Sequence, residues 1–80
     1  MNRTEIEEKV REFLIDDLEI DEELIVDDAK LKEDLGIDSL DFVDIVVIVE
    51  KTFGFKMKTE EMGKVKTFND FCDYIEKKIA

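Results

Sequence analysis

Apolar residues recur at helical spacing near both ends of the chain. Toward the amino end, Thr4-Glu5-Ile6-Glu7 pairs a hydroxyl residue with an acid three positions later, which is a capping-box pattern. An apolar stripe at helical spacing begins inside it, and we predict a first helix over about residues 5–18. Its members are Ile6, Val10, Phe13, Leu14 and Leu18.

The last segment has the same signals. Thr67-Phe68-Asn69-Asp70 repeats the capping spacing, and Lys77 and Lys78 suit the carboxyl end of a helix dipole. We predict a final helix from about Phe68 to Lys78, with one apolar face. That face holds Phe68, Phe71, Cys72, Ile75 and Ile79.

Residues 40–53 give conflicting signals. The run 45–49 is entirely β-branched and reads locally as a buried strand. Asp38 as a cap, Asp41 and Asp44 in the first turns and Lys51 near the end favour a helix instead. We therefore predict a helix from Leu40 to Phe53 that stops at Gly54.

The rest of the chain connects these three helices. Thr59-Glu60-Glu61-Met62 predicts one short helix, with Thr59 as its candidate cap, before Gly63. Residues 19–37 are acidic and lack a sustained period, so they predict a long loop pinned to the core by scattered apolar side chains. These are Ile20, Leu24, Ile25, Leu31, Leu35 and Ile37. The pattern predicts an all-α single domain spanning 1–80.

Charge narrows the choice of partners. The formal net charge is -11, and residues 1–50 hold 18 acids against 5 bases, whereas residues 51–80 hold 5 acids against 7 bases. An acidic surface disfavours nucleic acid and favours basic protein surfaces.

The cysteine count, the spacing of the acids and the hydropathy argue against a disulfide, a metal site and a membrane span. Cys72 is the only cysteine, so no internal disulfide is possible, and its place on an apolar stripe predicts a small buried hydrophobe. The acidic segment 16–21 lacks the spacing of an EF-hand, so we predict no metal site. No apolar run approaches the length of a membrane span and no signal core is visible, so we expect a cytoplasmic protein without membrane insertion.

Asp38-Ser39-Leu40 lies where the long loop meets the second main helix. Such a tripeptide is typical of an ordinary helix start. A negatively charged group on Ser39 would also be favoured there, because a helix begins with free backbone N–H groups and a positive dipole end.

The surrounding sequence favours attachment at this serine. The segment Asp34-Leu35-Gly36-Ile37-Asp38-Ser39-Leu40-Asp41, with Phe53-Gly54-Phe55 and Asp73-Tyr74-Ile75, resembles the acyl carrier protein family over about residues 4–79. The resemblance implies a small up-down bundle of three main helices plus one short helix. It also implies that a phosphopantetheinyl transferase uses coenzyme A to attach 4′-phosphopantetheine to Ser39, between Asp38 and Leu40. The thiol of that group would carry acyl cargo as thioesters.

The composition favours a carrier over an enzyme. The chain has no histidine, which excludes a Ser-His-Asp hydrolase, and nothing beside Ser39 is an evident general base. Asp38 and Asp41 would repel an alkoxide. Acids this numerous are more often a solvated face than a catalytic carboxylate pair.

The second main helix is the candidate docking surface. Helical spacing places its acids on one strip beside apolar residues, an arrangement suited to brief docking on basic surfaces of acyl-loading and chain-elongating enzymes. A solvated acidic face without a partner is the plainer reading. The predicted docking residues are Asp38, Leu40, Asp41, Val43, Asp44, Val47 and Glu50. We expect the chain to act as a monomer.

The resemblance further implies that cargo enters between the second main helix and the short helix. The predicted pocket residues are Phe42, Ile45, Val46, Val49, Met57, Met62, Val65 and Phe71, and Phe53 and Phe68 should also face inward. Phe42 and Phe71 are bulkier than the small residues expected there in the family. Lys56, Lys58, Lys64 and Lys66 make the region around the short helix basic. Both departures favour a specialised carrier, such as one in a secondary pathway, over the principal fatty-acid carrier.

Three functions fit the sequence. The first is a discrete acyl carrier in fatty-acid or polyketide-like synthesis, favoured by Asp38 and the acidic face. The second is a peptidyl or D-alanyl carrier that uses the same arm. The third is an unmodified helical adaptor that uses the docking surface alone.

Overall fold

The computed structural model describes residues 1–79, and these residues form an all-helical domain. Its elements are α1 (Arg3–Asp16), the short 3-10 helix η1 (Glu22–Leu24), α2 (Ser39–Phe53), α3 (Thr59–Met62) and α4 (Phe68–Ile79). Within that range the only β-type pairing is one isolated bridge between Lys30 and Thr67. The predicted fold of three main helices, one short helix and a long loop is confirmed.

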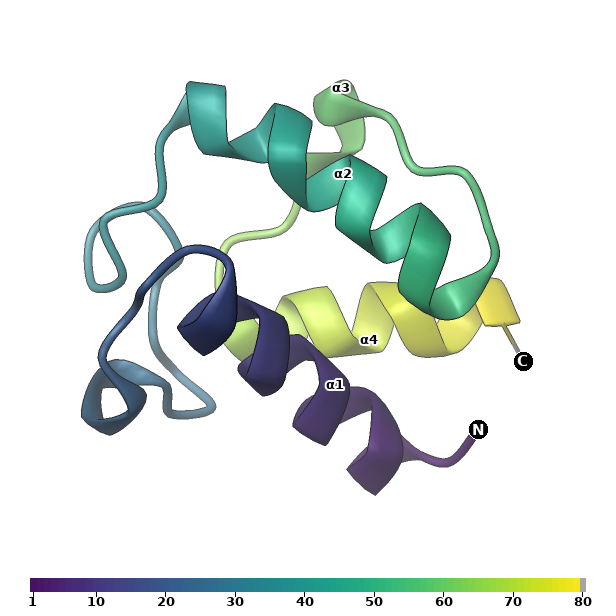
Figure 1. Cartoon of the computed structure of the whole chain (residues 1–80), viewed down its shortest axis with the longest axis horizontal. Helices are drawn as coiled ribbons and strands as arrows, with labels where there is room; N and C mark the ends of the chain where they lie inside the picture. The colour runs from purple at the N-terminus through teal and green to yellow at the C-terminus, as the bar shows by residue number, and fades with distance from the viewer. Residues whose placement is uncertain (80) are drawn as a thin grey trace.

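The helices pack in two pairs, with α1 against α4 and α2 against α3. Figure 1 shows α1 and α4 side by side, α2 crossing above them and the long loop closing the end of the bundle where α2 begins. The start of α1 and the end of α4 lie toward the opposite end. The start of α2 is therefore held by the loop and lies far from these two helix ends.

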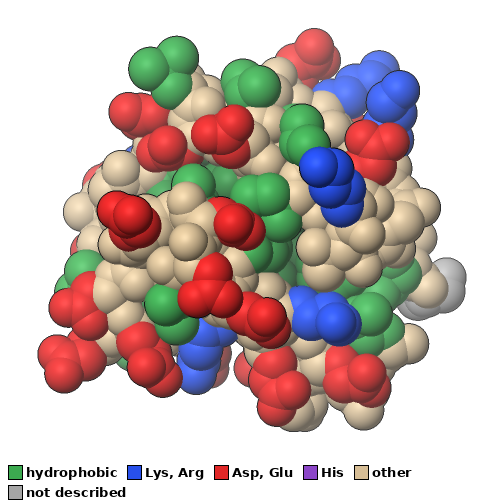
Figure 2. All heavy atoms as spheres, in the orientation of Figure 1, with side chains coloured by type: hydrophobic (Ala, Val, Ile, Leu, Met, Phe, Trp, Pro, Cys, Tyr) green, Lys and Arg blue, Asp and Glu red, His purple; other side chains and the backbone are tan. Residues whose placement is uncertain are grey.

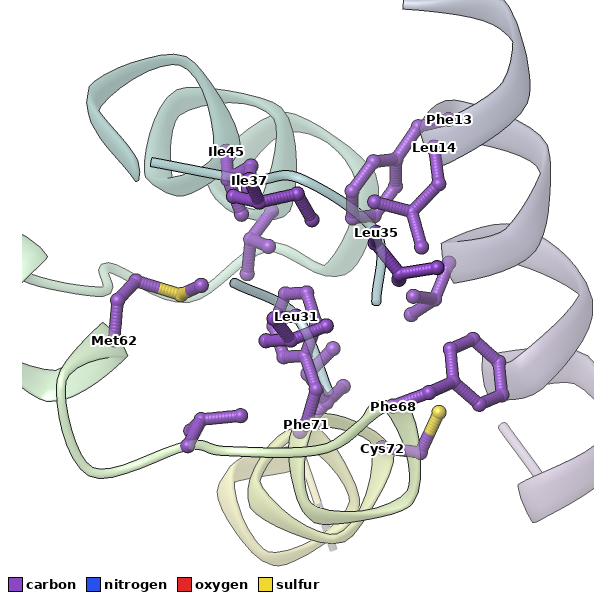
Figure 3. Close-up of a cluster of buried hydrophobic side chains, with 14 of the residues drawn as sticks. Phe13, Leu14, Leu31, Leu35, Ile37, Ile45, Met62, Phe68, Phe71 and Cys72 are labelled. Carbon is purple, nitrogen blue, oxygen red and sulfur yellow. The ribbon is translucent and has the colours of Figure 1, made fainter. Parts of the chain in front are cut away.

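One hydrophobic core joins all these elements. Side chains from α1, the long loop, α2, α3 and α4 converge on it, as Figure 3 shows for Phe13, Leu31, Ile45, Met62 and Phe71. The five-residue β-branched run of α2 fits this setting as a helix. Ile45 and Val49 are buried one turn apart, Val46 and Ile48 pack at the margin, and Val47 faces out.

The long loop is pinned as predicted, with one exception. Ile20, Ile25, Leu31, Leu35 and Ile37 are buried. Leu24 was expected to join them, but it is 49% exposed. It ends the single turn of η1, where Ile25 takes the inward position.

Backbone hydrogen bonds fasten the loop to the segment that leads into α4. Leu31 N donates to Lys66 O over 2.9 Å, and Phe68 N donates to Ala29 O over 2.9 Å. Asn69 N donates to Asp27 O over 3.1 Å. Because backbone groups on both sides satisfy one another, the loop is ordered without being a strand.

Two predicted caps are wrong, whereas those at the start of α4 and the end of α2 are confirmed. The side chain of Asn2, not Thr4, accepts from Glu5 N at 2.9 Å, so α1 spans Arg3–Asp16 and starts and ends two residues earlier than predicted. At α3, Lys58 takes the cap position without a side-chain bond, and Thr59 is already helical. The Thr67–Asp70 pair bonds reciprocally, and Gly54 ends α2 with φ of 79°, a left-handed conformation that glycine adopts without strain.

Arg3 clamps the first turn of α1 to α4. Its guanidinium bonds Glu7 on its own helix, Asp73 and Glu76 on α4, and the backbone and side-chain oxygens of Asn69. The hydrogen bond to Asp73 is the main cause that raises the pKa of Arg3 above its usual range. Several charges converge on one planar group, so this network stabilises more than an isolated surface pair.

Arg3→Gln should lower the free energy of unfolding by about 1 kcal/mol, which corresponds to about 4–8 °C in melting temperature for a domain of this size. Urea denaturation and thermal melts would measure the loss. Lys56→Gln removes an exposed positive charge and should change stability by less than about 0.5 kcal/mol. Equal effects of the two variants would contradict the clamp.

Cys72 is fully buried in α4, as predicted. Burial raises the pKa of its thiol from 9.0 to about 12. The thiol therefore ionises at lower pH in the unfolded chain than in the folded one, and the free energy of unfolding falls as pH rises from about 9 toward about 12.

At pH 8 we expect a thiol reagent to label Cys72 in native protein at least ~100-fold more slowly than in protein unfolded in guanidinium. Comparable rates would place the thiol at the surface.

Candidate functional site

The candidate site is the amino end of α2, where Asp38 and Asp41 form a reciprocal capping box. Asp38 Oδ1 accepts from Leu40 N at 2.9 Å and from Asp41 N at 3.2 Å, and Asp41 Oδ2 accepts from Asp38 N at 3.1 Å. Ser39 is the first helical residue, placed between these two acids in sequence. Its position is thus fixed by hydrogen bonds that join these two carboxylates to the backbone on both sides.

The turn before the site also aims the serine outward. Leu35 and Ile37 are both buried, and Gly36 between them has φ of 69°. A side chain at this position would be strained in the left-handed conformation, so glycine lets the chain turn between two anchors. Ile37 N also donates to Leu31 O at 2.9 Å. Asp38 and Ser39, directly after this anchor, are exposed.

The expectation of free N–H groups at this helix start is wrong for two residues. The N–H groups of Leu40 and Asp41 are taken by the carboxylate of Asp38, because a charged oxygen on the cap residue binds them locally. These carboxylates are engaged in capping, and neither forms a hydrogen bond to the Ser39 hydroxyl. The site offers an accessible hydroxyl that a partner must activate.

A covalent group fits at Ser39. The side chain is exposed, it makes no hydrogen bond within residues 1–79, and the next residue, Leu40, is 80% exposed. An attached phosphodiester would project into solvent without displacing any packed side chain. Its negative charge would lie near the positive end of the α2 dipole.

The predicted docking residues lie on the accessible side of α2. Leu40, Val43 and Val47 are among the few large hydrophobic side chains that the described surface exposes. Asp38, Asp44 and Glu50 are exposed, and Asp41 is half-buried. The structure therefore brings an apolar strip and acidic neighbours together beside Ser39.

Sequence reasoning missed a groove between α2 and α1. Two cavities of about 280 and 310 Å³ adjoin there and share Asp17 and Ile48 in their linings. Figure 2 shows a hollow on this face with hydrophobic side chains at its floor and acidic side chains around it. Asp44 and Val47 of the docking strip line the smaller cavity, so the strip continues into the groove. Helix periodicity could not reveal this, because it describes one helix at a time.

The predicted pocket residues all lie in or against the core. Seven are buried, and Val46 packs at the margin as Phe53 does. Phe71 meets Phe13 edge-on with ring centroids 6.2 Å apart, and the Lys32 ammonium lies 5.6 Å from the centroid of the Phe42 ring. Met62 and Val65 also line an open cavity on the outside of the bundle. The two phenylalanines fill space in the folded core.

Comparison with known proteins identifies the family. The phosphopantetheine attachment site family matches residues 8–75. An acyl carrier protein of Thermosynechococcus vestitus is 42% identical over 80 residues, which cover 100% of this chain and 99% of the relative. An acyl carrier protein of Thermotoga maritima is 42% identical over 79 residues, covering 99% and 98%. This chain belongs to the acyl carrier protein family.

Membership of this family settles the prosthetic group and the general role. Acyl carrier proteins are carriers rather than enzymes, and they bear covalently attached 4′-phosphopantetheine. No helix within residues 1–79 is long and apolar enough to span a membrane. No group of three or more acidic, histidine or cysteine side chains in that range is arranged to hold a metal ion.

Two substitutions distinguish the capping hydrogen bonds of Asp38 from the effect of its charge. Asp38→Ala should lower the free energy of unfolding by about 1 kcal/mol, because two N–H groups lose their acceptor. Asp38→Asn keeps an acceptor and should cost only a few tenths of a kcal/mol. Chemical denaturation of both variants would measure the difference. Equal losses would mean that charge, not capping, stabilises the helix start.

Proposed function

We propose that this chain is a single-domain carrier that holds acyl groups as thioesters on 4′-phosphopantetheine attached to Ser39. The observation that supports it best is the exposed Ser39 hydroxyl at the first position of α2, inside the region that matches the attachment-site family. When bound, the group supplies a thiol that the chain itself lacks at its surface, since Cys72 is buried.

The chain's own residues position this attachment. The buried loop anchors and the capping box fix the backbone of Ser39. A phosphopantetheinyl transferase supplies the base that deprotonates the accessible hydroxyl. Coenzyme A is the donor in this proposal. Fatty-acid or polyketide-like synthesis is the proposed setting, because the relatives are acyl carrier proteins.

Partner enzymes dock on the accessible side of α2 in this proposal. Leu40, Val43 and Val47 form the apolar centre, while Asp44 and Glu50 attract basic surfaces. The strip is small, which suits brief encounters by a monomer that visits several enzymes in turn. The formal charge of -11 supports fast electrostatic association with basic proteins.

Ser39→Ala provides the direct test. Wild-type protein incubated with coenzyme A and a broad-specificity transferase should gain one phosphopantetheine by intact mass, and the variant should gain none. Circular dichroism should show that both stay folded, since Ser39 makes no side-chain hydrogen bond within residues 1–79. An unmodified, folded wild type would favour the adaptor function. Selective loading by aminoacyl-activating enzymes would favour the peptidyl or D-alanyl carrier.

Docking can be tested by charge reversal at Asp44. Asp44→Lys should slow association with the transferase about threefold to tenfold at low salt, and the effect should shrink in 0.5 M salt. Stopped-flow fluorescence would measure the rate. Glu22→Lys makes the same charge change on η1, outside the docking strip, and should have a smaller effect. Equal slowing by both would indicate attraction by net charge alone.

A further inference from the structure

Two large hydrophobic side chains of the long loop are exposed, although the proposed function does not use them. Leu24 is 49% exposed and Val26 is 55% exposed. Among residues 1–79, the other exposed large hydrophobic side chains are Met1 and the three of the docking strip on α2. Leu24 and Val26 thus serve neither the core nor the docking proposed above.

The backbone holds both side chains outward on either side of a buried anchor. Ile25 lies between them and is 3% exposed. Its N–H donates to Glu22 O over 3.1 Å, and Val26 N donates to Leu24 O over 3.1 Å. Because this backbone is already fixed, little conformational entropy is lost when a partner covers the two side chains.

An open cavity of about 340 Å³ lies beside Leu24 and Val26, and among the described residues no basic side chain lines it. Three acids do, namely Glu23, Asp28 and Asp34. The carboxylate of Asp34 is engaged, since it accepts from the N–H of Lys30 over 2.8 Å. Glu23 and Asp28 are exposed and form no ion pair within residues 1–79.

We call Glu23, Leu24, Val26 and Asp28 the loop patch, and its charge indicates what it accepts. Residues 19–28 hold six acids and no base. A second copy of this chain would bring a like net charge of -11 against them, and an anionic membrane or nucleic acid would be repelled as well. A basic protein segment has the opposite charge, and apolar side chains on it can cover Leu24 and Val26.

The loop patch is separate from the docking strip of α2. Figure 1 shows the single turn of η1 at the lower left and the start of α2 at the upper left, with other parts of the loop between them. The cavity beside the patch shares no lining residue with the groove between α1 and α2. A partner on the loop patch therefore leaves Ser39 and the docking strip accessible.

We propose that the loop patch is a second docking surface, which holds a basic segment with apolar side chains on a partner protein. The apolar side chains of that segment cover Leu24 and Val26, and its lysines or arginines meet Glu23 and Asp28. Binding here keeps the carrier near its partner while an enzyme docks on α2, which raises the effective concentration of the carrier at that enzyme. The interaction does not depend on attachment at Ser39.

The test uses unmodified protein and two short synthetic peptides. One alternates lysine with leucine, and the other has serine in place of each leucine, so both carry the same charge. The methyl NMR signal of Ala29, which lines the cavity, reports binding at the loop patch. In about 0.15 M salt the leucine peptide should bind there about fivefold to tenfold more tightly than the serine peptide. Equal binding would mean attraction by charge alone and would overturn the proposal.

Matched variants assign the binding to the loop patch. Leu24→Gln with Val26→Thr should lower the affinity for the leucine peptide, followed at Ala29, about fivefold to tenfold. Leu40→Gln with Val43→Thr makes the same two changes on exposed residues of α2 and should retain the affinity at Ala29. The proposal fails if the α2 variant loses as much affinity as the loop-patch variant.

Stability and modification of the loop-patch variant provide a further check. Both side chains are about half-exposed, so the melting temperature should change by less than about 4 °C. The transferase should modify Ser39 in this variant at the wild-type rate. A larger fall in melting temperature would show that the two side chains serve the fold, and slower modification would place them in the docking surface of the transferase. Either result would overturn the proposal.

The remaining occupant is a second copy of this chain. Sedimentation should show a monomer in about 0.5 M salt, where repulsion between like charges is largely screened. A dimer that Leu24→Gln with Val26→Thr abolishes would mean that the patch joins two copies, which would overturn the proposal. If the transferase leaves wild-type Ser39 unmodified while the leucine peptide still binds at Ala29, the carrier function fails and the second docking surface stands.

Discussion

The attachment of the long loop to the core and to the start of α4 is the constraint on which the rest of the structure depends. Leu31, Leu35 and Ile37 are buried, and backbone bonds join Leu31 to Lys66 and Phe68 to Ala29. The loop is acidic and would otherwise repel itself, so burial of its few apolar side chains must outweigh charge repulsion and the entropy of ordering. This anchoring brings Asp38 to the point where α2 begins, and the capping box then fixes Ser39 at the surface.

Much of the fold was accessible from sequence because the decisive signals are local. The apolar face of α4, its Thr67–Asp70 cap and the stop at Gly54 each depend on residues within a turn or two of one another. The error at the start of α1 arose because two neighbouring residues are both suitable caps. Asn2 and Thr4 could both cap α1, and only the final register shows that Asn2 does. Leu24 matched the apolar pattern of its loop, but it ends the single turn of η1, and the next residue, Ile25, faces the core in its place.

The candidate site could be predicted from the sequence to about the same extent as the fold. Ser39 and the exposed α2 strip follow from one motif and one helical period. The groove beside Asp17 and the open cavity beside Met62 do not, because each is built from segments far apart in sequence. Engagement of the Leu40 and Asp41 N–H groups was also missed, since the sequence marks Asp38 as a cap without saying how many donors it satisfies. Surface features that are built from two or more elements could therefore be found only in the three-dimensional structure.

The capping box uses individual carboxylate oxygens selectively. Both backbone donors bond Oδ1 of Asp38, and the return bond from Asp38 N goes to Oδ2 of Asp41. Each carboxylate therefore uses only one of its two oxygens in the capping box. In the docking proposed above, an arginine or lysine of the partner enzyme binds the other oxygen and leaves the first turn of α2 intact. One carboxylate would then serve both the proposed recognition and the helix start, so brief docking would not move Ser39.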